Sequence, residues 1–334
     1  MNIAFFELED WERKMFQDRL GSSHTLTFFD SPLGIDLLGQ INSVEILVLF
    51  VNSQVTEEVV NSLPALKCIA TMSTGYDHID LSACANKNIQ VSNVPTYGEY
   101  TVAEHTFALI LTISRKIFES QKRIKEGVFS PEGLTGFDLN GKTLGVIGTG
   151  NIGRNVIKIA KGFGMNVIAY NRSYNEALSQ ELGFTYKDLD SVLRESDIIT
   201  LHVPLTEETQ HLINEEKFSI MKDGAIIINT SRGGVLDTTA LLKVLDSGKI
   251  KAAGIDVVEE EPLLKEEKQL LTRRFNTDEL QCVIEGHMLA MHPNVIMTPH
   301  NAFNSTEALQ RIINTTIDNI EGFVSASPKN TVSK

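Results

Sequence analysis

The chain has 334 residues, which is long for one domain and suits two domains that each bury a core. Its composition, 42% hydrophobic and 22% charged residues, is typical of a soluble globular protein. The formal net charge of −13 argues against nonspecific binding to nucleic acid or to an anionic membrane, because both need a positive surface.

The cysteines and the hydropathy pattern exclude further classes. Cys68, Cys84 and Cys282 are odd in number and lack C-x-x-C spacing, so we expect neither a disulfide framework nor a zinc site, and we predict no bound metal. The N-terminal apolar run turns acidic too soon for a signal peptide, and no apolar run approaches the roughly 20 residues of a membrane span. We therefore predict a cytoplasmic protein with no membrane partner.

The first hundred residues alternate short apolar runs with helical patterns. The expected strands are 3–6, 25–29, 46–51, 68–72 and 89–94, and the expected helices or turns lie near 10–19, 56–63 and 81–85. Such alternation predicts a parallel sheet with both faces covered. Apolar residues then recur at helical spacing, which predicts one long helix over 101–127, and Pro95 before it suggests a hinge at 95–100.

A second alternating series begins near residue 142. Its expected strands are 144–147, 167–170, 197–201, 225–229, 252–257 and 295–298, the number in a full dinucleotide-binding sheet. A last amphipathic helix over 305–324 and a polar tail follow. Residues 259–292 are charged and long for a connection inside a sheet, so we predict an irregular segment that is functional or peripheral.

A glycine-rich turn lies between the first strand and the first helix of this second series. Gly148 suits the tight turn, Gly150 would let backbone approach a pyrophosphate, and Gly153 would let helix and strand pack closely. Asn151 and Ile152 would open the helix, whose free N–H groups attract phosphate. The pattern alone also fits an ordinary turn, but the flanking strands favour dinucleotide binding.

Three side chains that could take part in binding or catalysis follow strands of the same sheet. Arg232 follows the strand at 225–229, where its planar fork could bind a carboxylate, although a surface arginine in a turn has the same pattern. Asp256 ends the next strand and could accept a hydrogen bond from a cofactor carboxamide. His300 follows the last strand and is a candidate proton donor, although a single histidine there is more often structural.

Together these groups match the reduction of a 2-oxo acid. Arg232 would hold the carboxylate and polarise the carbonyl, His300 would donate a proton to the developing alkoxide, and a nearby carboxylate would favour the charged imidazole. His202, also at a strand end, is followed by Pro204 after one residue and is better assigned to the cofactor cleft.

Five separated motifs resemble those of the D-isomer-specific 2-hydroxyacid dehydrogenases, most closely the D-lactate dehydrogenases. They are the glycine turn 148–153, Leu201-His202-Val203-Pro204, Asn229-Thr230-Ser231-Arg232-Gly233, Asp256-Val257 with Glu261-Pro262, and Thr298-Pro299-His300. Tyr97 and Phe303 match further positions of the D-lactate enzymes, and we expect both to contact substrate. The resemblance covers nearly the whole chain.

The resemblance implies a catalytic triad of Arg232, Glu261 and His300. Glu261 is preferred over its two glutamate neighbours because it stands 29 residues after Arg232, the spacing of the family's pair. The resemblance also implies that backbone N–H groups of Ser73, Thr74, Gly75 and Tyr76 bind the substrate carboxylate, and that Asp256 anchors the nicotinamide amide. It assigns to the cofactor cleft His202, Val203, Pro204, Thr230 and Ser231.

The same resemblance implies an α/β architecture of two doubly wound parallel-sheet domains. A Rossmann-type cofactor domain, residues 101–298, would be inserted into a flavodoxin-like substrate domain, residues 1–100 plus 299–334. It also implies a homodimer formed through the 101–127 helix.

Two departures leave the specificity open. Asn171 and Arg172 stand where an acidic residue would bond the ribose hydroxyls of NAD, so NADP is possible as cofactor beside NAD. Asn52 stands where D-lactate enzymes often carry an aromatic residue, which would admit a bulkier or more polar 2-oxo acid such as hydroxypyruvate, glyoxylate or 2-oxoisocaproate. A non-catalytic nucleotide sensor of the same fold is the alternative outside the enzymes.

Overall fold

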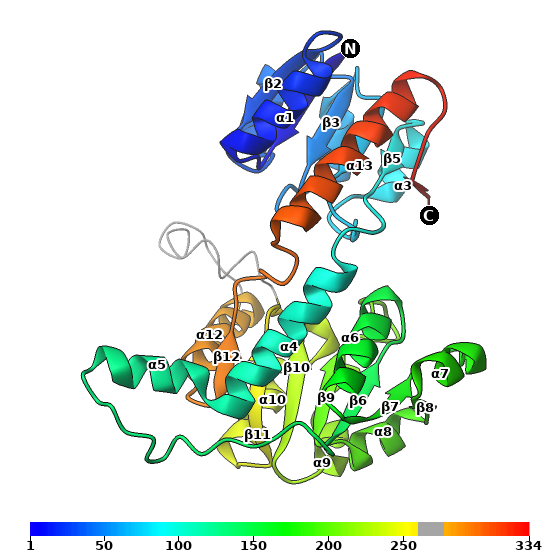
Figure 1. Ribbon diagram of the computed structural model, residues 1–334. Helices are drawn as coiled ribbons and strands as arrows, with labels where there is room; N and C mark the ends of the chain where they lie inside the picture. The colour runs from blue at the N-terminus through cyan, green and yellow to red at the C-terminus, as the bar shows by residue number, and fades with distance from the viewer. Residues whose placement is uncertain (260–276, 334) are drawn as a thin grey trace. The chain divides into compact units, whose positions relative to one another are not determined.

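The structure, a computed structural model, describes residues 1–259 and 277–333 and divides into two compact units (Figure 1). One unit comprises Met1–Tyr97 and Asn304–Lys334, and the other comprises Gly98–Phe303. The second unit is thus inserted into the first, and its ends lie a few residues from the boundaries predicted after residues 100 and 298.

The first unit is built on a sheet in the order β13-β5-β4-β3-β1-β2. Without β13 this is the flavodoxin-like order 2-1-3-4-5, and these five strands are parallel. Its elements are β1 (Asn2–Phe6), α1 (Asp10–Leu20), β2 (Thr25–Phe29), the short 3₁₀ helix η1 (Ile35–Gln40), β3 (Ile46–Leu49), α2 (Glu57–Ser62), β4 (Cys68–Thr71), α3 (Leu81–Asn86), β5 (Gln90–Ser92), α13 (Thr306–Val324) and β13 (Thr331–Val332).

Both faces of this sheet are covered, as the continuous apolar strands require. On β1, Ala4 and Phe6 belong to a core that includes residues of α2, α3 and η1, while Phe5 packs against Phe16 of α1 on the other face. The polar tail that follows the last helix also contains an unpredicted two-residue strand, β13, which pairs antiparallel with β5. A two-residue strand has no readable periodicity, so only the pairing reveals it.

The second unit contains a sheet in the order β12-β11-β10-β9-β6-β7-β8, whose strand pairs are all parallel. Counted from β6 this is the Rossmann order 3-2-1-4-5-6 with one further strand. Its elements are α4 (Glu99–Arg115), α5 (Ile117–Lys125), β6 (Thr143–Ile147), α6 (Asn151–Gly162), β7 (Asn166–Tyr170), α7 (Glu176–Leu182), β8 (Thr185–Tyr186), α8 (Leu189–Glu195), β9 (Ile198–Leu201), α9 (Glu215–Ile220), β10 (Ala225–Asn229), the 3₁₀ turn η2 (Gly233–Val235), α10 (Thr238–Asp246), β11 (Ile250–Ile255), α12 (Thr277–Met291) and β12 (Val295–Met297).

Alternation along β10 shows how one apolar run serves two cores. Ile226 and Ile228 pack into the core shared with α4 and α6, whereas Ile227 packs into the core shared with α8, α9, α10 and α12. Figure 1 shows α4 and α6 side by side, and the two helices are in contact.

The prediction of one helix over 101–127 is wrong, because Lys116 interrupts it. Lys116 lies in the left-handed region, with φ 49° and ψ 44°, between α4 and α5. The Ser114 carbonyl, which a continuing helix would bond internally, instead accepts the N–H of Phe137 at 3.0 Å. Gly136 sits so close that a Cβ there would lie 2.1 Å from the Ser114 carbonyl oxygen. A returning loop therefore ends α4.

Two further expectations need correction. The short strand β8 was outside the six predicted strands of this sheet, again because two residues give no pattern. The segment predicted as irregular, residues 259–292, includes the helix α12, which packs against α10. Residues 260–276, with Glu261, lie outside the described residues.

Candidate functional site

The glycine turn follows β6 directly and lies against the end of β9. Gly148 has φ 99°, a conformation that favours glycine, and its N–H donates to the Tyr170 carbonyl at 2.9 Å. A Cβ on Gly148 would lie 2.4 Å from the His202 carbonyl oxygen and 3.0 Å from a Val203 methyl carbon. The predicted cleft residues His202 and Val203 therefore border this turn.

The rest of the turn leaves room for a ligand at one position and none at another. A Cβ on Gly153 would lie 2.0 Å from the Gly148 carbonyl oxygen, so helix and turn are packed without space for a side chain. A Cβ on Gly150 would meet no atom within 4 Å. Gly150 is the N-cap of α6 without a side-chain cap, so the first amides of the helix, from Asn151 and Ile152 onward, can bind an anion. This cradle fits a pyrophosphate.

His202 adds a buried polar atom beside the turn. Its Nε2 lies 2.8 Å from the Thr200 hydroxyl, while Nδ1 is buried and has no hydrogen-bond partner among the described residues. Burial lowers the pKa of His202 to about 3, so the ring is neutral. An orphaned buried polar atom costs about 1–3 kcal/mol, and a ligand on this edge could satisfy it. Next along the chain, the Pro204 carbonyl accepts from the Thr209 hydroxyl at 2.6 Å.

The residues after β7 hold the glycine turn in place. The Asn171 side-chain oxygen accepts the N–H of Thr149 at 3.1 Å, and its amide donates to the Ser173 carbonyl at 2.8 Å. The Thr149 hydroxyl lies 2.9 Å from the hydroxyl of Tyr186 on β8. Arg172 has no hydrogen bond or ion pair to any residue that the structure describes. Sequence reasoning missed Tyr186, and no local signal marks it, since β8 itself escapes detection.

A fully buried asparagine shapes the turn that carries Arg232. The Asn229 side chain donates to the Arg232 carbonyl at 2.9 Å and accepts from the N–H and hydroxyl of Ser231 at 3.1 and 2.8 Å. The Arg232 guanidinium donates to the Ser231 carbonyl at 2.8 Å. The Thr230 hydroxyl lies 3.1 Å from that of Thr106 on α4. The sequence motif that contains Asn229 gave this residue no role. Its position at the end of a buried strand is the signal that could have indicated one.

Asp256, at the end of β11, organises the turn that carries His300. Its side chain is buried, at 2% exposure, and accepts hydrogen bonds from the Thr298 hydroxyl and from the N–H groups of Asn301 at 2.8 Å and Ala302 at 3.0 Å. Burial alone would raise the pKa of Asp256, but these bonds and His105 lower it below its usual value. The carboxylate is therefore ionised. The predicted bond to a nicotinamide amide would add to these contacts and stays a prediction.

His300 itself has an unusual backbone. Its φ of 52° is left-handed, and its N–H donates to the carbonyl oxygens of Asp256 at 2.9 Å and Thr298 at 3.0 Å. The imidazole and the ring of Phe303 meet edge to face, with centroids 6.3 Å apart.

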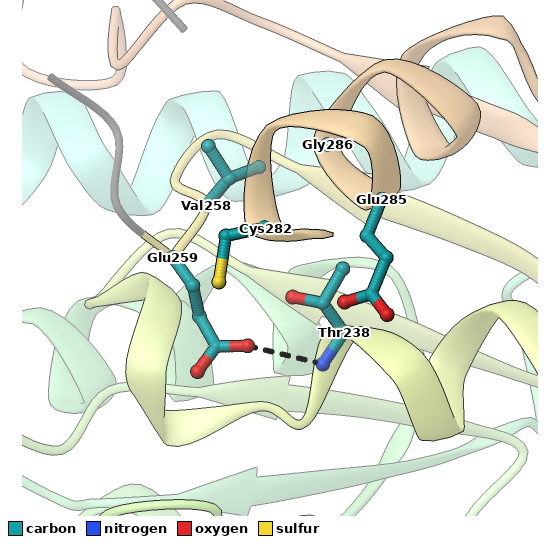
Figure 2. Close-up of a pocket in the computed structure, with 6 residues that line it drawn as sticks. All are labelled: Thr238, Val258, Glu259, Cys282, Glu285 and Gly286. Carbon is teal, nitrogen blue, oxygen red and sulfur yellow. Dashed lines mark hydrogen bonds between the residues drawn. The ribbon is translucent and has the colours of Figure 1, made fainter. Parts of the chain in front are cut away.

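Of the three consecutive glutamates, the first has a structural role. One carboxylate oxygen of Glu259 lies 2.5 Å from Nε2 of His211, and the other accepts the N–H of Thr238 at 3.3 Å. Figure 2 shows this carboxylate aimed at the start of α10, in a small pocket that Cys282 and Glu285 of α12 also line. A carboxylate at a helix N-terminus is stabilising. The predicted catalytic Glu261 lies beyond the described residues.

In the first unit, the residues after β4 form a turn held by side chains. The Ser73 hydroxyl donates to the Gly75 carbonyl at 2.6 Å, and the Thr74 hydroxyl donates to the Val94 carbonyl at 2.8 Å. Within the described part of the chain, the backbone N–H groups of Ser73, Thr74, Gly75 and Tyr76 donate to no residue. Amides left without internal acceptors suit the binding of a carboxylate.

Two other substrate-contact candidates are also placed. The Tyr97 carbonyl accepts from Arg311 at 2.8 Å. The Asn52 side-chain amide donates to Glu7 at 2.7 Å, so a carboxylate fixes this residue. Glu7 was not singled out from the sequence.

The candidate residues of the second unit meet at one edge of its sheet. The glycine turn follows β6, His202 follows β9, Arg232 follows β10, Asp256 follows β11 and His300 follows β12. Because all these strands are parallel, their carboxyl ends share an edge, where ligands of such sheets bind. Among the described residues, no group of three His, Cys, Asp or Glu side chains could hold a metal ion, and no helix is long and apolar enough to cross a bilayer. The fold and this edge define a dinucleotide-dependent oxidoreductase.

Comparison with known proteins identifies the family. Residues 107–302 match the model of the D-isomer specific 2-hydroxyacid dehydrogenase NAD binding domain. The chain is 38% identical to the D-lactate dehydrogenase of Escherichia coli, over 96% of each chain. It is 38% identical to the glyoxylate reductase of Thermococcus litoralis, over 91% of this chain and 87% of that one. A crystal structure of Aquifex aeolicus D-lactate dehydrogenase complexed with NAD and lactic acid has a TM-score of 0.88 at 38% identity and covers 98% of this chain and 96% of that chain.

The chain therefore belongs to the D-isomer specific 2-hydroxyacid dehydrogenase family. It is an oxidoreductase that acts on the CH–OH group of its donor and carries an NAD-binding domain. The Rossmann-type and flavodoxin-like strand orders confirm the fold class predicted from the sequence.

Proposed function

We propose that this chain is a D-lactate dehydrogenase that interconverts pyruvate and D-lactate with NAD(H). The observation that carries the proposal is that Arg232 follows β10 and His300 follows β12 at one edge of the sheet, which also carries a glycine cradle that fits a pyrophosphate. The 38% identity to a D-lactate dehydrogenase over 96% of both chains supports pyruvate as the substrate.

In this proposal each residue has a separate chemical task. The Arg232 guanidinium binds the carboxylate of the 2-oxo acid and polarises its carbonyl, because its planar fork matches two oxygens. The His300 imidazole donates a proton to the oxygen that becomes the hydroxyl, and Glu261 favours the charged imidazole. The cofactor, when bound, supplies the hydride. The N–H groups of residues 73–76 are assigned to the substrate carboxylate, and Tyr97 and Phe303 are each assigned to substrate contact.

The cofactor is proposed to lie along the cleft residues of the glycine turn and the neighbouring strand ends. NAD(H) is favoured because Asn171 can bond ribose hydroxyls while it holds Thr149. NADP(H) remains open, because Arg172 has no partner among the described residues and could pair with a 2′-phosphate. Asn171→Asp should shift the ratio of kcat/KM for NADH over NADPH upward, since a carboxylate repels the phosphate. An unchanged ratio would remove Asn171 from cofactor selection.

The test of substrate is a spectrophotometric panel. NADH and NADPH are each combined with pyruvate, 2-oxobutyrate, 2-oxoisocaproate, phenylpyruvate, glyoxylate and hydroxypyruvate. The proposal expects the highest kcat/KM with pyruvate and NADH, and the D enantiomer of lactate as product. Preference for another oxo acid would reject the substrate, and no turnover with any of them would reject the reaction and favour a nucleotide sensor.

A second candidate is a glyoxylate or hydroxypyruvate reductase that uses NADPH. The identity to a glyoxylate reductase equals that to the D-lactate enzyme, although it spans less of both chains. Asn52 presents a small polar side chain that Glu7 holds in place, which suits a polar substrate better than the methyl of pyruvate. Because pocket methylenes contribute only about 1–3 kcal/mol each, the same panel should show graded differences in kcat/KM among the acids rather than activity with one acid alone.

We further propose that the chain forms a homodimer through the segment of α4, α5 and the residues after them. Five apolar side chains are exposed on α5 and just after it: Ile117, Phe118, Ile124, Val128 and Phe129, the last at 94%. Such a cluster is typical of an interface. Light scattering should report a dimer that the double variant Phe118→Glu/Phe129→Glu converts to a monomer. Ile35→Glu, at an exposed apolar residue of the first unit, is the matched control and should stay dimeric.

A further inference from the structure

Helix α4 directs one imidazole at the base of the His300 turn. Nε2 of His105 lies 3.1 Å from the Thr298 hydroxyl oxygen and 3.5 Å from a carboxylate oxygen of Asp256. His105 and Thr298 are 193 residues apart in the sequence, so only the packing of α4 on the sheet brings them together.

Hydrogen-bond accounting fixes the direction of these contacts. The buried Asp256 carboxylate is ionised and can only accept, so the Thr298 hydroxyl donates its hydrogen to it. Having used its hydrogen, the Thr298 oxygen accepts from His105. Nε2 of His105 therefore carries a hydrogen.

The far end of the same network holds the candidate proton donor. The Asp256 carboxylate accepts the amides of Asn301 and Ala302, and its own backbone carbonyl accepts the N–H of His300. His300 has a left-handed φ of 52°, which a residue with a Cβ adopts only when its surroundings hold it there. The direction of the His300 side chain therefore depends on Asp256 and on the groups that orient Asp256.

We propose that His105 is a positioning residue of the dehydrogenase reaction. Its Nε2–H donates to Thr298 and lies against Asp256, and so fixes the turn that aims the His300 imidazole. The inference rests on the proposed role of His300 as proton donor. It deepens that role by assigning a task to a side chain on α4, far from the catalytic motifs in sequence.

The first experiment compares His105→Leu, which removes the donor, with His105→Gln, whose amide can place an N–H near the position of Nε2. His105→Leu should lower kcat by about 10- to 100-fold, as small displacements of a catalytic group do. The Kd for NADH should change less than kcat, because the pyrophosphate cradle of the glycine turn does not contact this network, although Asp256 is predicted to bond the nicotinamide amide. His105→Gln should recover most of the lost kcat. Full activity of His105→Leu, or equal losses in both variants, would overturn the proposal.

A second experiment tests the route through Thr298 and does not depend on the folding of a His105 variant. Thr298→Val removes the relaying hydroxyl at nearly constant volume, whereas Thr298→Ser keeps it. Thr298→Val should reproduce the kcat loss and Thr298→Ser should not. The double variant His105→Leu/Thr298→Val should lose no more than either single variant, because both break one path. Losses that multiply would show that His105 acts by another route.

A readout without turnover separates this inference from the proposed reaction. With histidines labelled at ¹³Cε1, the His300 resonance should shift in Thr298→Val and stay in place in His24→Gln, a control in the first unit. If the wild-type chain reduces no 2-oxo acid, the proposed function fails, yet this shift still reports whether the network orients His300. An unmoved His300 resonance would reject the inference even in an active enzyme.

Discussion

At the scale of single residues, buried polar side chains decide where the reactive ones point. Asn229 closes the turn of Arg232, Asp256 closes the turn of His300, and Glu259 ties the segment after β11 to the start of α10. Asn229 and Asp256 are buried, so an unmade bond there would cost the full desolvation of the group, whereas Glu259 is partly exposed. Residues outside the proposed triad therefore hold the turns that carry Arg232 and His300.

The role of His300 as proton donor predicts a loss of turnover. His300→Ala should lower kcat by about 100-fold or more, the usual contribution of a general acid. Steady-state kinetics with pyruvate and NADH measures it, and the Kd for NADH checks that the cofactor site is intact. His24→Ala is the control for loss of an imidazole elsewhere. A His300→Ala enzyme with normal kcat would assign the proton to another group.

The buried His202 predicts how stability changes with pH. Its pKa is about 3 in the folded chain, against 6.5 for the free side chain, so between these values the unfolded chain binds more protons. The contribution of His202 to the free energy of unfolding is therefore fully present above about pH 6.5 and is lost as the pH falls towards 3. At pH 5.5 the loss from this residue alone is about 1.4 kcal/mol. Urea unfolding at pH 7.5 and 5.5 should show that His202→Gln loses about 1.4 kcal/mol less than wild type. Identical losses would mean that His202 is protonated in the folded state.

At the scale of elements, α6 combines packing and binding in its first turn. Gly153 packs against the backbone of Gly148, while Gly150 faces open space. Packing therefore requires glycine at position 153, whereas at position 150 only the proposed ligand would exclude a side chain. At the other end of α6, a Cβ on Gly162 would meet no atom within 4 Å, so packing does not require glycine there.

This contrast predicts opposite outcomes for one substitution along one helix. Gly153→Ala should destabilise the chain and abolish NADH binding, because its Cβ would overlap the Gly148 carbonyl. Gly162→Ala, the matched control, should stabilise the helix by about 0.5–1 kcal/mol through lower chain entropy. Gly150→Ala should leave the melting temperature unchanged and weaken NADH binding. Calorimetry and cofactor titration measure both properties, and tight binding by Gly150→Ala would remove the pyrophosphate from that position.

At the scale of the whole molecule, the two units have separate cores and separate proposed roles. The first core is built from residues before 97 and after 304, so the chain must leave the first unit, complete the second and return. Every proposed cofactor residue lies in the second unit. Trp11, the one tryptophan, lies on α1 in the first.

This division predicts that cofactor protects the two units unequally. NAD⁺ at 100 times its Kd should stabilise the second unit by about 2.7 kcal/mol, because it binds only the folded form. Trp11 fluorescence, which reports the first unit, should shift less with NAD⁺ than far-UV circular dichroism does. The Gly153→Ala variant should show no shift by either probe. Equal shifts in the wild type would mean that both units unfold as one.

The strands that line the site could be read from the sequence because their signals are local. β2 and β10 have the predicted bounds, and the glycine turn, Arg232 and His300 stand after the strands that the apolar runs predicted. Two-residue strands such as β8 and β13 escaped, because a pattern needs several residues to repeat. The break at Lys116 escaped as well, since its cause is a loop some twenty residues further on that takes the Ser114 carbonyl.

The sequence by itself determined the fold class, the family and the order of the motifs along the chain, because periodicity and spacing are properties of neighbouring residues. Only the tertiary structure decided which side chains support the reactive ones. Tyr186 reaches Thr149 and His105 reaches Thr298 across distances that no local pattern records. Hydrogen bonds between buried groups depend on how helices and strands pack, and packing brings together residues that are far apart in the chain.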